Sequence, residues 1–242
     1  MTTIEGATLI TGASRGIGLS LARHLAHEGH EVVGLARSEA PEGFAGTFYR
    51  ADLADAADTA WALGEITWRH RVLRLVNNAG AIVGGMLDEA RMEDFDRLVA
   101  INLRAPMQAM QAVAPAMREA RFGRIVNIGS RAALGKTGRV IYSATKAGIV
   151  GMTRTLALEL AGDGITVNCI APGPVETELF AENNPPGSEA RRQFVAAVPV
   201  GRIGMPEDIA VACAYFLDAR SGFTTGQTLN VCGGLSVGIA SL

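Results

Sequence analysis

Two side chains, at positions 142 and 146, have the chemical types and the spacing of a proton-transfer pair. Tyr142 and Lys146 are four residues apart, which places them on the same face of a helix. A free tyrosine titrates near ~10, and one ammonium group at about 4 Å stabilises its phenolate by about 4 kcal/mol at an effective dielectric constant of about 20. We therefore expect Tyr142 to exchange a proton with a substrate and Lys146 to tune that exchange.

Ser130 is the third candidate for chemistry. It follows the apolar run Arg124–Gly129, which predicts a strand. The carboxyl ends of strands are where open α/β sheets bind ligands, so its hydroxyl is expected to hydrogen-bond a substrate oxygen. The alternative is that the spacing is accidental, since three tyrosines and two lysines in the chain can give one such pair by chance. The assignment therefore depends on the rest of the sequence.

A glycine-rich loop follows the first predicted strand, Ala7–Thr11. It runs Gly12-Ala-Ser-Arg-Gly-Ile-Gly18 and leads into a helical pattern that Gly29 ends. Glycines allow a tight turn, and the free N–H groups of a helix N-terminus bind a pyrophosphate. The spacing differs from the common G-x-G-x-x-G, and an ordinary glycine turn is the alternative. Its position at the first strand–helix junction favours a dinucleotide-binding loop.

The second predicted strand, Glu31–Ala36, is followed by Arg37 and Ser38 and by no acidic residue. In a dinucleotide-binding fold this end meets the adenosine ribose, where an acid would bind the 2′-hydroxyl of NAD. Arg37 therefore favours the 2′-phosphate of NADP as the preferred cofactor, with NAD as a possible one. The alternative interpretation of Arg37 is a solvated loop cation.

Strands and helices alternate along the whole chain. The other predicted strands are Thr47–Ala51, Leu73–Val76, Arg124–Gly129, Ile165–Ile170 and Gln227–Val231. Helical patterns follow the third strand, cover Asp88–Ala120 with bends at Pro106 and Pro115, cover Ser143–Ala161, and begin again at Pro206. This alternation predicts an α/β fold, a Rossmann-type doubly wound parallel sheet of about seven strands, in a single domain over residues 1–242.

Residues 177–200 are expected to be irregular, because they contain the turn-forming run Asn-Asn-Pro-Pro-Gly. Such a segment at the carboxyl edge of the strands predicts a mobile substrate lid. Substrate specificity is expected to lie in this lid, in Ala81–Met86 and in Arg131–Lys136. Within the lid, Arg191 and Arg192 are expected to meet either an anion or water.

The composition excludes several classes of protein. The chain of 242 residues is 48% hydrophobic and carries a net charge of −2 with both signs scattered, so we expect neither a nucleic-acid nor a membrane partner. No apolar run approaches the ~18 residues of a membrane span, and the first residues lack the features of a signal peptide. A cytoplasmic location is expected. The cysteines, Cys169, Cys213 and Cys232, are predicted to be buried small hydrophobes in a reducing compartment.

Three histidines, His24, His27 and His30, recur every third residue and suggest a metal site. Steps of three drift around a helix, and Gly29 ends this helix before His30. A solvated helix face is the favoured interpretation, and no metal is expected.

Taken together, these motifs resemble those of the short-chain dehydrogenase/reductase family over essentially the whole chain. The segment Thr11–Gly18 resembles the cofactor loop of that family, and Asn77-Asn-Ala-Gly80 resembles its second motif. The positions of its catalytic tetrad are occupied by Asn102, Ser130, Tyr142 and Lys146. The segment that meets the nicotinamide is matched by Pro172, Gly173 and Thr177.

The resemblance implies reversible hydride transfer between a nicotinamide and a carbonyl or secondary alcohol of a small molecule. Tyr142 would exchange the proton with the substrate oxygen that Ser130 holds, Lys146 would bond the nicotinamide ribose, and Asn102 would support a water chain that relays the proton. Together with the residues argued above, the expected cofactor-binding set is Gly12, Ser14, Arg15, Gly16, Ile17, Gly18, Arg37, Asp52, Leu53, Asn78, Ala79, Gly80, Tyr142, Lys146, Pro172, Gly173, Val175 and Thr177. In this set Asp52 and Leu53 would meet the adenine.

Two departures from the family pattern affect the interpretation. The connection from Arg37 to Thr47 is too short for the helix that the family often has there. The general pattern is most similar to 3-oxoacyl-acyl-carrier-protein reductases, which dock their acidic carrier with two arginines. Arg121 matches one of these, but Asp163 occupies the other position and would repel an acidic partner.

A reductase or dehydrogenase of small molecules is therefore the preferred function. The carrier-protein reductase is the alternative. A catalytically silent nucleotide-sensing or scaffold protein is disfavoured because all four residues of the tetrad are present.

Two helical segments predict self-association. Ser143–Ala161 is small or apolar on most sides, and Arg104–Met117 contains Met107, Met110 and Met117. Together they offer more apolar surface than one face of a sheet can cover, which marks an interface. The family resemblance implies a homotetramer.

The sequence predicts that NADPH is preferred over NADH by ~10- to ~10³-fold, because charge-assisted bonds from Arg15 and Arg37 converge on the 2′-phosphate. The measurement is kcat/KM with each cofactor, in the wild type and in Arg37→Ala. Equal values in the wild type, or a preference that the substitution leaves unchanged, would show that Arg37 does not bind the phosphate.

Overall fold

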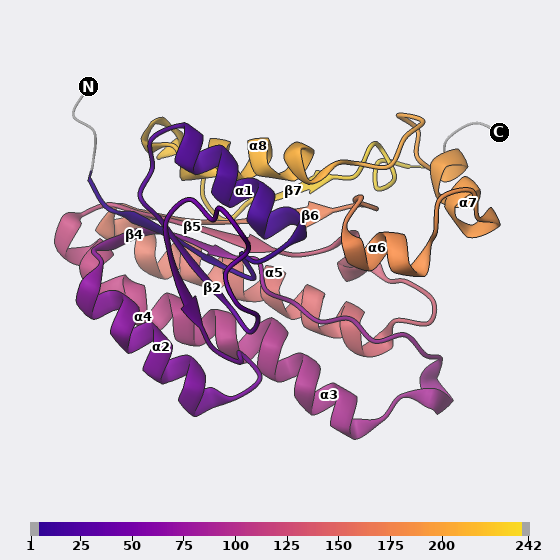
Figure 1. Cartoon of the computed structure of the whole chain (residues 1–242), viewed down its shortest axis with the longest axis horizontal. Coiled ribbons are helices and arrows are strands. Elements are labelled where there is room, and N and C mark those ends of the chain that lie inside the picture. Colours follow the sequence, from indigo (N-terminus) through magenta and orange to yellow (C-terminus); the bar gives the residue numbers. More distant parts are fainter. Residues whose placement is uncertain (1–4, 239–242) are drawn as a thin grey trace.

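A seven-stranded parallel sheet forms the centre of the computed structural model, which describes residues 5–238 (Figure 1). Its strands are β1 (Ala7–Thr11), β2 (Val32–Ala36), β3 (Thr47–Arg50), β4 (Val72–Asn77), β5 (Gly123–Ile128), β6 (Ile165–Pro172) and β7 (Thr228–Val231). They lie in the order β3-β2-β1-β4-β5-β6-β7, and every neighbouring pair is parallel. The predicted Rossmann-type sheet is confirmed, with strand ends within two residues of those expected.

Helices cover both faces of this sheet. They are α1 (Gly16–His27), α2 (Ala56–Arg69), α3 (Met92–Val99), α4 (Ala105–Ala120), α5 (Val140–Leu160), α6 (Glu178–Asn183), α7 (Glu189–Ala197) and α8 (Pro206–Leu217). Figure 1 shows α1 and α8 on one face, α2, α4 and α5 on the other, and α6 and α7 beyond one edge. Each face has its own buried apolar cluster, so the sheet is the shared wall between two cores.

The central strands are buried along their whole length because the sheet is covered twice. Every residue of β1, β4, β5 and β6 is buried. Such continuous burial is what parallel strands between two helical layers require, since both faces of each strand exclude water. The three cysteines are free and buried, as the sequence predicted. Within residues 5–238, no helix combines the length and the apolar character needed to cross a bilayer.

Strand order reverses between β1 and β4. From β1 the chain continues outward to β2 and β3, and it then returns to place β4 on the other side of β1. At such a switch point the loops after the two central strands diverge to opposite faces and leave a crevice at their carboxyl ends. The loops concerned are the two glycine-containing motifs, 12–18 and 77–80, so the fold itself brings them together.

Two sequence-based expectations about secondary structure are wrong. Residues 177–200 are not irregular: Thr177 caps α6, Ser188 caps α7, and only the turn around Gly187 separates them. Amino-acid composition does not predict these short helices, because turn-forming residues dominate the segment. The expected helix Asp88–Ala120 is interrupted: a 3₁₀ turn precedes α3, and a π-helical turn, Ala100–Arg104, joins α3 to α4.

Part of the argument for self-association also fails. Met110 and Met117 are buried against the sheet, at 3% and 0% exposure, so they add nothing to the outer surface of α4. By contrast, the expected short connection after Arg37 is confirmed. The described segment from Arg37 to Gly46 contains no helix, and Phe44 instead packs edge-on against Phe48 at 5.0 Å between ring centroids.

Arg124, on β5, ties the amino edge of the sheet together. Its guanidinium donates to the carbonyl oxygens of Gly123, Gly164, Asp218 and Ala219 at 2.8–3.3 Å. It also lies over the ring of Phe122, 4.3 Å from the centroid. Burial, reinforced by the nearby Arg74, lowers the pKa of Arg124. One side chain therefore donates hydrogen bonds to backbone carbonyls at the start of β5, after the end of α8 and in the turn before β6.

We expect Arg124→Met to lower the free energy of unfolding by about 2–4 kcal/mol, because it leaves several buried carbonyls without a donor. Denaturant unfolding at fixed protein concentration measures this loss. Arg220→Gln is the control, since Arg220 is exposed and pairs only with Asp218. It should change stability by no more than ~0.5 kcal/mol, and equal losses in the two variants would contradict the role of Arg124.

Candidate active site

The loop after β1 has a backbone that only glycine adopts comfortably. Gly12 and Gly16 have positive φ angles of 67° and 53°. A Cβ atom on Gly12 would lie 2.9 Å from the Cα of Ala79, and one on Gly18 would lie 2.2 Å from the carbonyl oxygen of Gly12. The glycines therefore allow the loop to turn tightly and to approach the backbone that follows β4.

Asn78 holds this loop in place. Its side-chain amide donates to the carbonyl oxygens of Thr11 and Gly12, at 3.0 and 3.1 Å. In return, the hydroxyl of Thr11 accepts from the backbone N–H groups of Asn78 and Ala79, both at 3.0 Å. These four hydrogen bonds connect the carboxyl ends of β1 and β4. The two motifs that the sequence singled out thus form one rigid unit.

The N-terminus of α1 fits a pyrophosphate. No side chain in the described part of the chain caps it, and its first turn contains no acidic residue. The helix α2 shows the contrast, since Asp55 accepts hydrogen bonds from the N–H groups of Ala57 and Asp58. An uncapped helix start after a glycine turn leaves N–H donors for an anionic group. Ser14, Arg15 and Ile17 belong to this same turn.

Arg15 and Arg37 both lie at the edge where a 2′-phosphate is expected. Arg15 is the N-terminal flank of α1, and Arg37 follows β2, the neighbour of β1 in the sheet. Both are exposed, and neither forms an ion pair within residues 5–238. The sequence analysis missed Arg50, at the end of β3. Arg50 donates to the carbonyl of Arg37 at 3.0 Å and pairs with Glu39 at 2.7 Å.

The residues expected near the adenine have different environments. Leu53 is 8% exposed and belongs to the core between the sheet and α2. The carboxylate of Asp52 accepts from the N–H of Ala54 at 3.0 Å, and its own N–H donates to Asp58 at 2.7 Å. Both residues are fixed in the turn between β3 and α2, beside the end of β2.

Tyr142 and Lys146 occupy successive turns of α5, as their spacing predicted. The ammonium of Lys146 lies 5.8 Å from the ring centroid of Tyr142 and donates to the carbonyl oxygen of Ile128 at 2.7 Å. Lys146 is 5% exposed, whereas Tyr142 is half-buried. The lysine is therefore held between α5 and the end of β5, and the tyrosine remains partly accessible to solvent.

Ser130 begins the 3₁₀ turn Arg131–Leu134, immediately after β5. Its Oγ accepts a hydrogen bond from the N–H of Ala132 at 3.1 Å. That bond uses an oxygen lone pair and leaves the hydroxyl proton free to be donated. The residue sits two positions beyond Ile128, which accepts from Lys146, so the serine and the lysine share the carboxyl end of one strand.

Asn102 projects from the π-helical turn between α3 and α4. Its Oδ1 accepts from the N–H of Ala81 at 2.9 Å, and its Nδ2 donates to the carbonyl of Ala81 and to the hydroxyl of Thr145, both at 3.0 Å. Thr145 in turn donates to the carbonyl of Tyr142 at 2.9 Å. Asn102 is 1% exposed, and the π turn supplies the extra residue that aims it inward.

Gly80 shows that these groups surround one space. A Cβ atom placed on it would lie 3.4 Å from Oδ1 of Asn102 and 3.5 Å from Nζ of Lys146. Gly80 itself is exposed. The missing side chain therefore leaves the lysine and the asparagine accessible from the space beside Gly80.

The segment after β6 completes the site. Pro172 ends the strand, and a Cβ on Gly173 would lie 2.8 Å from the Cα of Cys232. Val175 is 6% exposed and pairs with Gly204 in an isolated bridge. Thr177 approaches the cofactor loop, since its Cγ2 lies 3.2 Å from the position of a Cβ on Gly16. The start of the 177–200 segment thus lies beside the glycine loop.

Comparisons with known proteins agree with this geometry. A sequence model of the family described as Enoyl-(Acyl carrier protein) reductase matches residues 12–236. The chain is 40% identical over 242 residues to a subunit of (2S)-[(R)-hydroxy(phenyl)methyl]succinyl-CoA dehydrogenase from Thauera aromatica, with 95% of this chain and 96% of the relative covered. It is 36% identical over 242 residues to a 3-oxoacyl-[acyl-carrier-protein] reductase from Vibrio cholerae, covering 96% and 98% of the two chains. The chain belongs to the short-chain dehydrogenase/reductase family.

A solved structure extends the likeness to three dimensions. A proposed NAD(P)-dependent gluconate 5-dehydrogenase from Beutenbergia cavernae, solved with NADP bound at low occupancy, superposes with a TM-score of 0.91. It is 32% identical, and 98% of this chain and 99% of that chain are covered. The protein is therefore an oxidoreductase of this family.

Several residues that position this reductase site were missed by the sequence analysis. Thr145 links Asn102 to α5, and Asn127 on β5 donates to Thr153 on α5 at 2.9 Å and accepts from Asn77 on β4 at 2.8 Å. All of these side chains are buried. Polar residues inside otherwise apolar strands and helices are the only signal the sequence gives of such contacts, because the partners are 26–50 positions apart.

Of the two arginines in residues 177–200 that were expected to meet an anion or water, Arg192 is exposed to solvent, whereas Arg191 is partly buried. Arg191 forms an ion pair with Glu176, and Arg192 pairs with Glu189. Phe180 on α6 and Phe194 on α7 stack edge to face at 5.5 Å. The two arginines of this segment are therefore paired with glutamates, and its helices α6 and α7 pack on each other through an aromatic pair.

Asp163 is not the free acid that the sequence suggested. Arg118 approaches one of its oxygens at 3.0 Å and Arg121 the other at 3.2 Å. Two guanidiniums around one carboxylate leave this surface with a net positive charge, so the expected repulsion of an acidic partner does not follow from Asp163.

His27 is exposed, His24 is partly buried, and burial, reinforced by Arg74, lowers the pKa of His30. His24 lies 3.5 Å from Glu28 on the same helix. Across the described residues, no group of three or more metal-ligating side chains is close enough to hold an ion.

We expect Asn78→Ala to raise the dissociation constant of NADP by about 10- to 100-fold, because two hydrogen bonds that fix the glycine loop are lost. Calorimetric titration with NADP measures this. Gln108→Ala is the control, because Gln108 makes the same kind of amide-to-carbonyl bond, to Ala56, away from the loop. If Asn78→Ala bound NADP with wild-type affinity, the hydrogen bonds from Asn78 would not be needed to hold the glycine loop for the cofactor.

Proposed function

We propose that this protein transfers hydride reversibly between NADP(H) and the carbonyl or secondary alcohol of a small molecule. The observation that carries the proposal is the position of Tyr142, one helical turn before a buried Lys146 whose ammonium is fixed on the end of β5. No other tyrosine in the chain is followed four residues later by a lysine. All four tetrad positions lie around the crevice where open α/β sheets bind ligands.

The residues of the chain supply the proton chemistry. In the direction of reduction, the bound nicotinamide supplies the hydride, and Tyr142 donates the proton to the substrate oxygen. The hydroxyl proton of Ser130 is free to hold that oxygen, because its lone pair already accepts from Ala132. The ammonium of Lys146 lies beside the tyrosine ring and stabilises the phenolate that remains. In oxidation the same steps run in reverse.

The expected cofactor residues divide into three groups by what they would bind. The glycine loop and the start of α1 would hold the pyrophosphate, and Arg15 with Arg37 would hold the 2′-phosphate. Lys146 and the open space at Gly80 would receive the nicotinamide ribose. The NADP in the Beutenbergia structure supports this choice of cofactor.

A carrier-protein reductase remains the second candidate function. The Vibrio cholerae relative has that name, and the positive surface formed by Arg118, Arg121 and Asp163 removes the charge objection to an acidic carrier. The Thauera aromatica and Beutenbergia cavernae relatives are named for other substrates, so their names do not favour it.

Homotetrameric assembly and a cytoplasmic location complete the proposal. One face of α5 packs on the sheet, and its outer face exposes Ala144, Ala147, Gly148, Gly151 and Leu158. Leu158 alone is 83% exposed. Small side chains in a row along a long helix allow a second helix to approach closely, which favours an α5-to-α5 contact.

Tyr142→Phe should lower kcat by at least ~10²-fold, because it removes the proton donor with little change in volume. A panel of ketones, ketoacids and alcohols, followed by NADPH absorbance, provides the measurement. Tyr215→Phe is the matched control: Tyr215 is exposed, and its hydroxyl meets only Thr224, so activity should stay within twofold.

Two outcomes would oppose the proposal. Turnover by Tyr142→Phe within tenfold of the wild type would remove the tyrosine from the mechanism. Binding of NADP by the wild type with no turnover across the panel would favour a silent nucleotide-binding protein instead.

A further inference from the structure

Three cations lie between the catalytic serine and the catalytic tyrosine. Arg131 directly follows Ser130, Arg139 is three residues before Tyr142, and Lys136 lies between them. None of the three forms an ion pair with a carboxylate of residues 5–238. In a chain of net charge −2, this concentration of positive charge at the substrate side is local.

The lid opposite has the reverse character. Its arginines Arg191 and Arg192 are both neutralised by glutamates. The positive charge that remains beside the reacting groups therefore comes from the 131–139 segment and not from the lid.

Lys136 extends from this segment toward the lid. Its ammonium lies 5.4 Å from the ring centroid of Phe194 on α7. Burial, and then repulsion by Arg139 and Arg131, lower the pKa of Lys136. Like charges that disfavour each other are stabilised together by an anion placed among them. Lys136 thus forms the outer wall of the substrate space. Because Arg131 and Arg139 repel its ammonium group, a bound anion would stabilise its charged form.

Arg139 is held by backbone rather than by an acid. Its Nη1 donates to the carbonyl of Gly138 at 2.7 Å and would be 2.3 Å from a Cβ on Gly84. Its Nε is buried without a partner among the described residues. The N–H of Gly85 donates to Gly138 at 3.0 Å and fastens the two loops around the guanidinium. Glycine at position 84 makes room for this cation.

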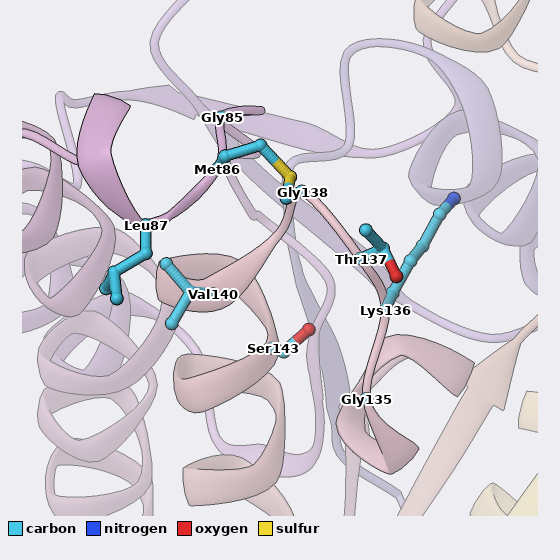
Figure 2. Close-up of a pocket in the computed structure, with 9 residues that line it drawn as sticks. All are labelled: Gly85, Met86, Leu87, Gly135, Lys136, Thr137, Gly138, Val140 and Ser143. Carbon is cyan, nitrogen blue, oxygen red and sulfur yellow. The ribbon is translucent and has the colours of Figure 1, made fainter.

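Lys136 and the residues on either side of Arg139 line a hollow of about 370 Å³, the size of a site for a small molecule. It is lined by Gly85, Met86, Leu87, Gly135, Lys136, Thr137, Gly138, Val140 and Ser143. Figure 2 shows Lys136 on one side of the hollow and Leu87 and Val140 on the other. The buried hydroxyl of Ser143 has no hydrogen-bond partner within residues 5–238. The hollow thus combines an apolar wall, a cationic wall and a free polar group.

We propose that the substrate carries an oxyanion group, a carboxylate or a phosphate, and that Arg131, Lys136 and Arg139 bind it beside the reacting carbon. The inference rests on the proposed hydride transfer and adds to it the charge of the substrate. The apolar wall of Met86, Leu87 and Val140 receives the uncharged part of the molecule. Arg131, Lys136 and Arg139 are then specificity residues, whereas the proton chemistry stays with Tyr142.

The first test compares one ketone with and without a charge. Acetoacetate and its methyl ester are reduced with saturating NADPH by the wild type, Lys136→Gln and Lys136→Arg. We expect Lys136→Gln to lower kcat/KM for acetoacetate about tenfold through KM, with the ester within twofold of the wild type. Lys136→Arg, which keeps the positive charge, should restore the wild-type ratio of kcat/KM for acetoacetate to kcat/KM for the ester. Equal losses for the two substrates would assign Lys136 a structural role and overturn the proposal.

Arg71→Gln is the matched control. Arg71 is exposed, lies at the amino edge of the sheet and forms no ion pair within the described residues, so the variant makes the same change in net charge away from the site. Its kinetics with both substrates should match the wild type. A tenfold loss with acetoacetate there would mean that net charge, and not the 131–139 segment, decides selectivity.

A second measurement does not depend on turnover. Succinate and inorganic phosphate are titrated by calorimetry into the protein saturated with NADP, for the wild type and for Arg131→Gln combined with Lys136→Gln. We expect at least one probe to bind the wild type tenfold more tightly than it binds the double variant. Tighter binding of succinate would indicate a carboxylate in the substrate, and tighter binding of phosphate would indicate a phosphate. Equal binding of both probes to both proteins would overturn the proposal. Failure of the proposed function would appear separately, as NADP binding without oxidation of NADPH by any ketone.

Discussion

The site depends on the place where the carboxyl ends of β1 and β4 meet. Thr11 and Gly12 share four hydrogen bonds with Asn78 and Ala79 across this junction, and glycine at position 12 avoids a Cβ atom that would separate the two backbones. Strand order reverses here, so every loop that carries chemistry opens to the same edge. A change in this junction would move the pyrophosphate turn away from the residues on α5.

Buried amide groups connect that junction to the proton-transfer residues. Asn102 binds both backbone groups of Ala81 and reaches Thr145 on α5, while Asn127 joins β4, β5 and α5. Each such group has to be paired, because an unsatisfied polar atom in this interior costs about 1–3 kcal/mol. The pairing therefore fixes the distance from the sheet to α5, and with it the place of Tyr142 relative to the end of β5.

Charge is distributed unevenly around the crevice. Arg191 and Arg192 each pair with a glutamate and Asp163 lies between two arginines, whereas the 131–139 segment leaves three cations without a carboxylate partner among the described residues. Such a difference does not stabilise the fold, since like charges repel. The unpaired cations would instead attract an anionic ligand, and the hollow beside Lys136 has space for one.

The sequence by itself determined the seven parallel strands, the glycine turn, and the spacing of Tyr142 and Lys146, because each is encoded within about twenty neighbouring residues. Only the tertiary structure decided which charges are free. Arg191 was expected at an anion or in water and instead pairs with Glu176, 15 positions away, and Asp163 is bracketed by two arginines from another element. Ion pairs and buried amide contacts join residues far apart in the chain, so local periodicity cannot reveal them. Their partners are set by how the layers pack.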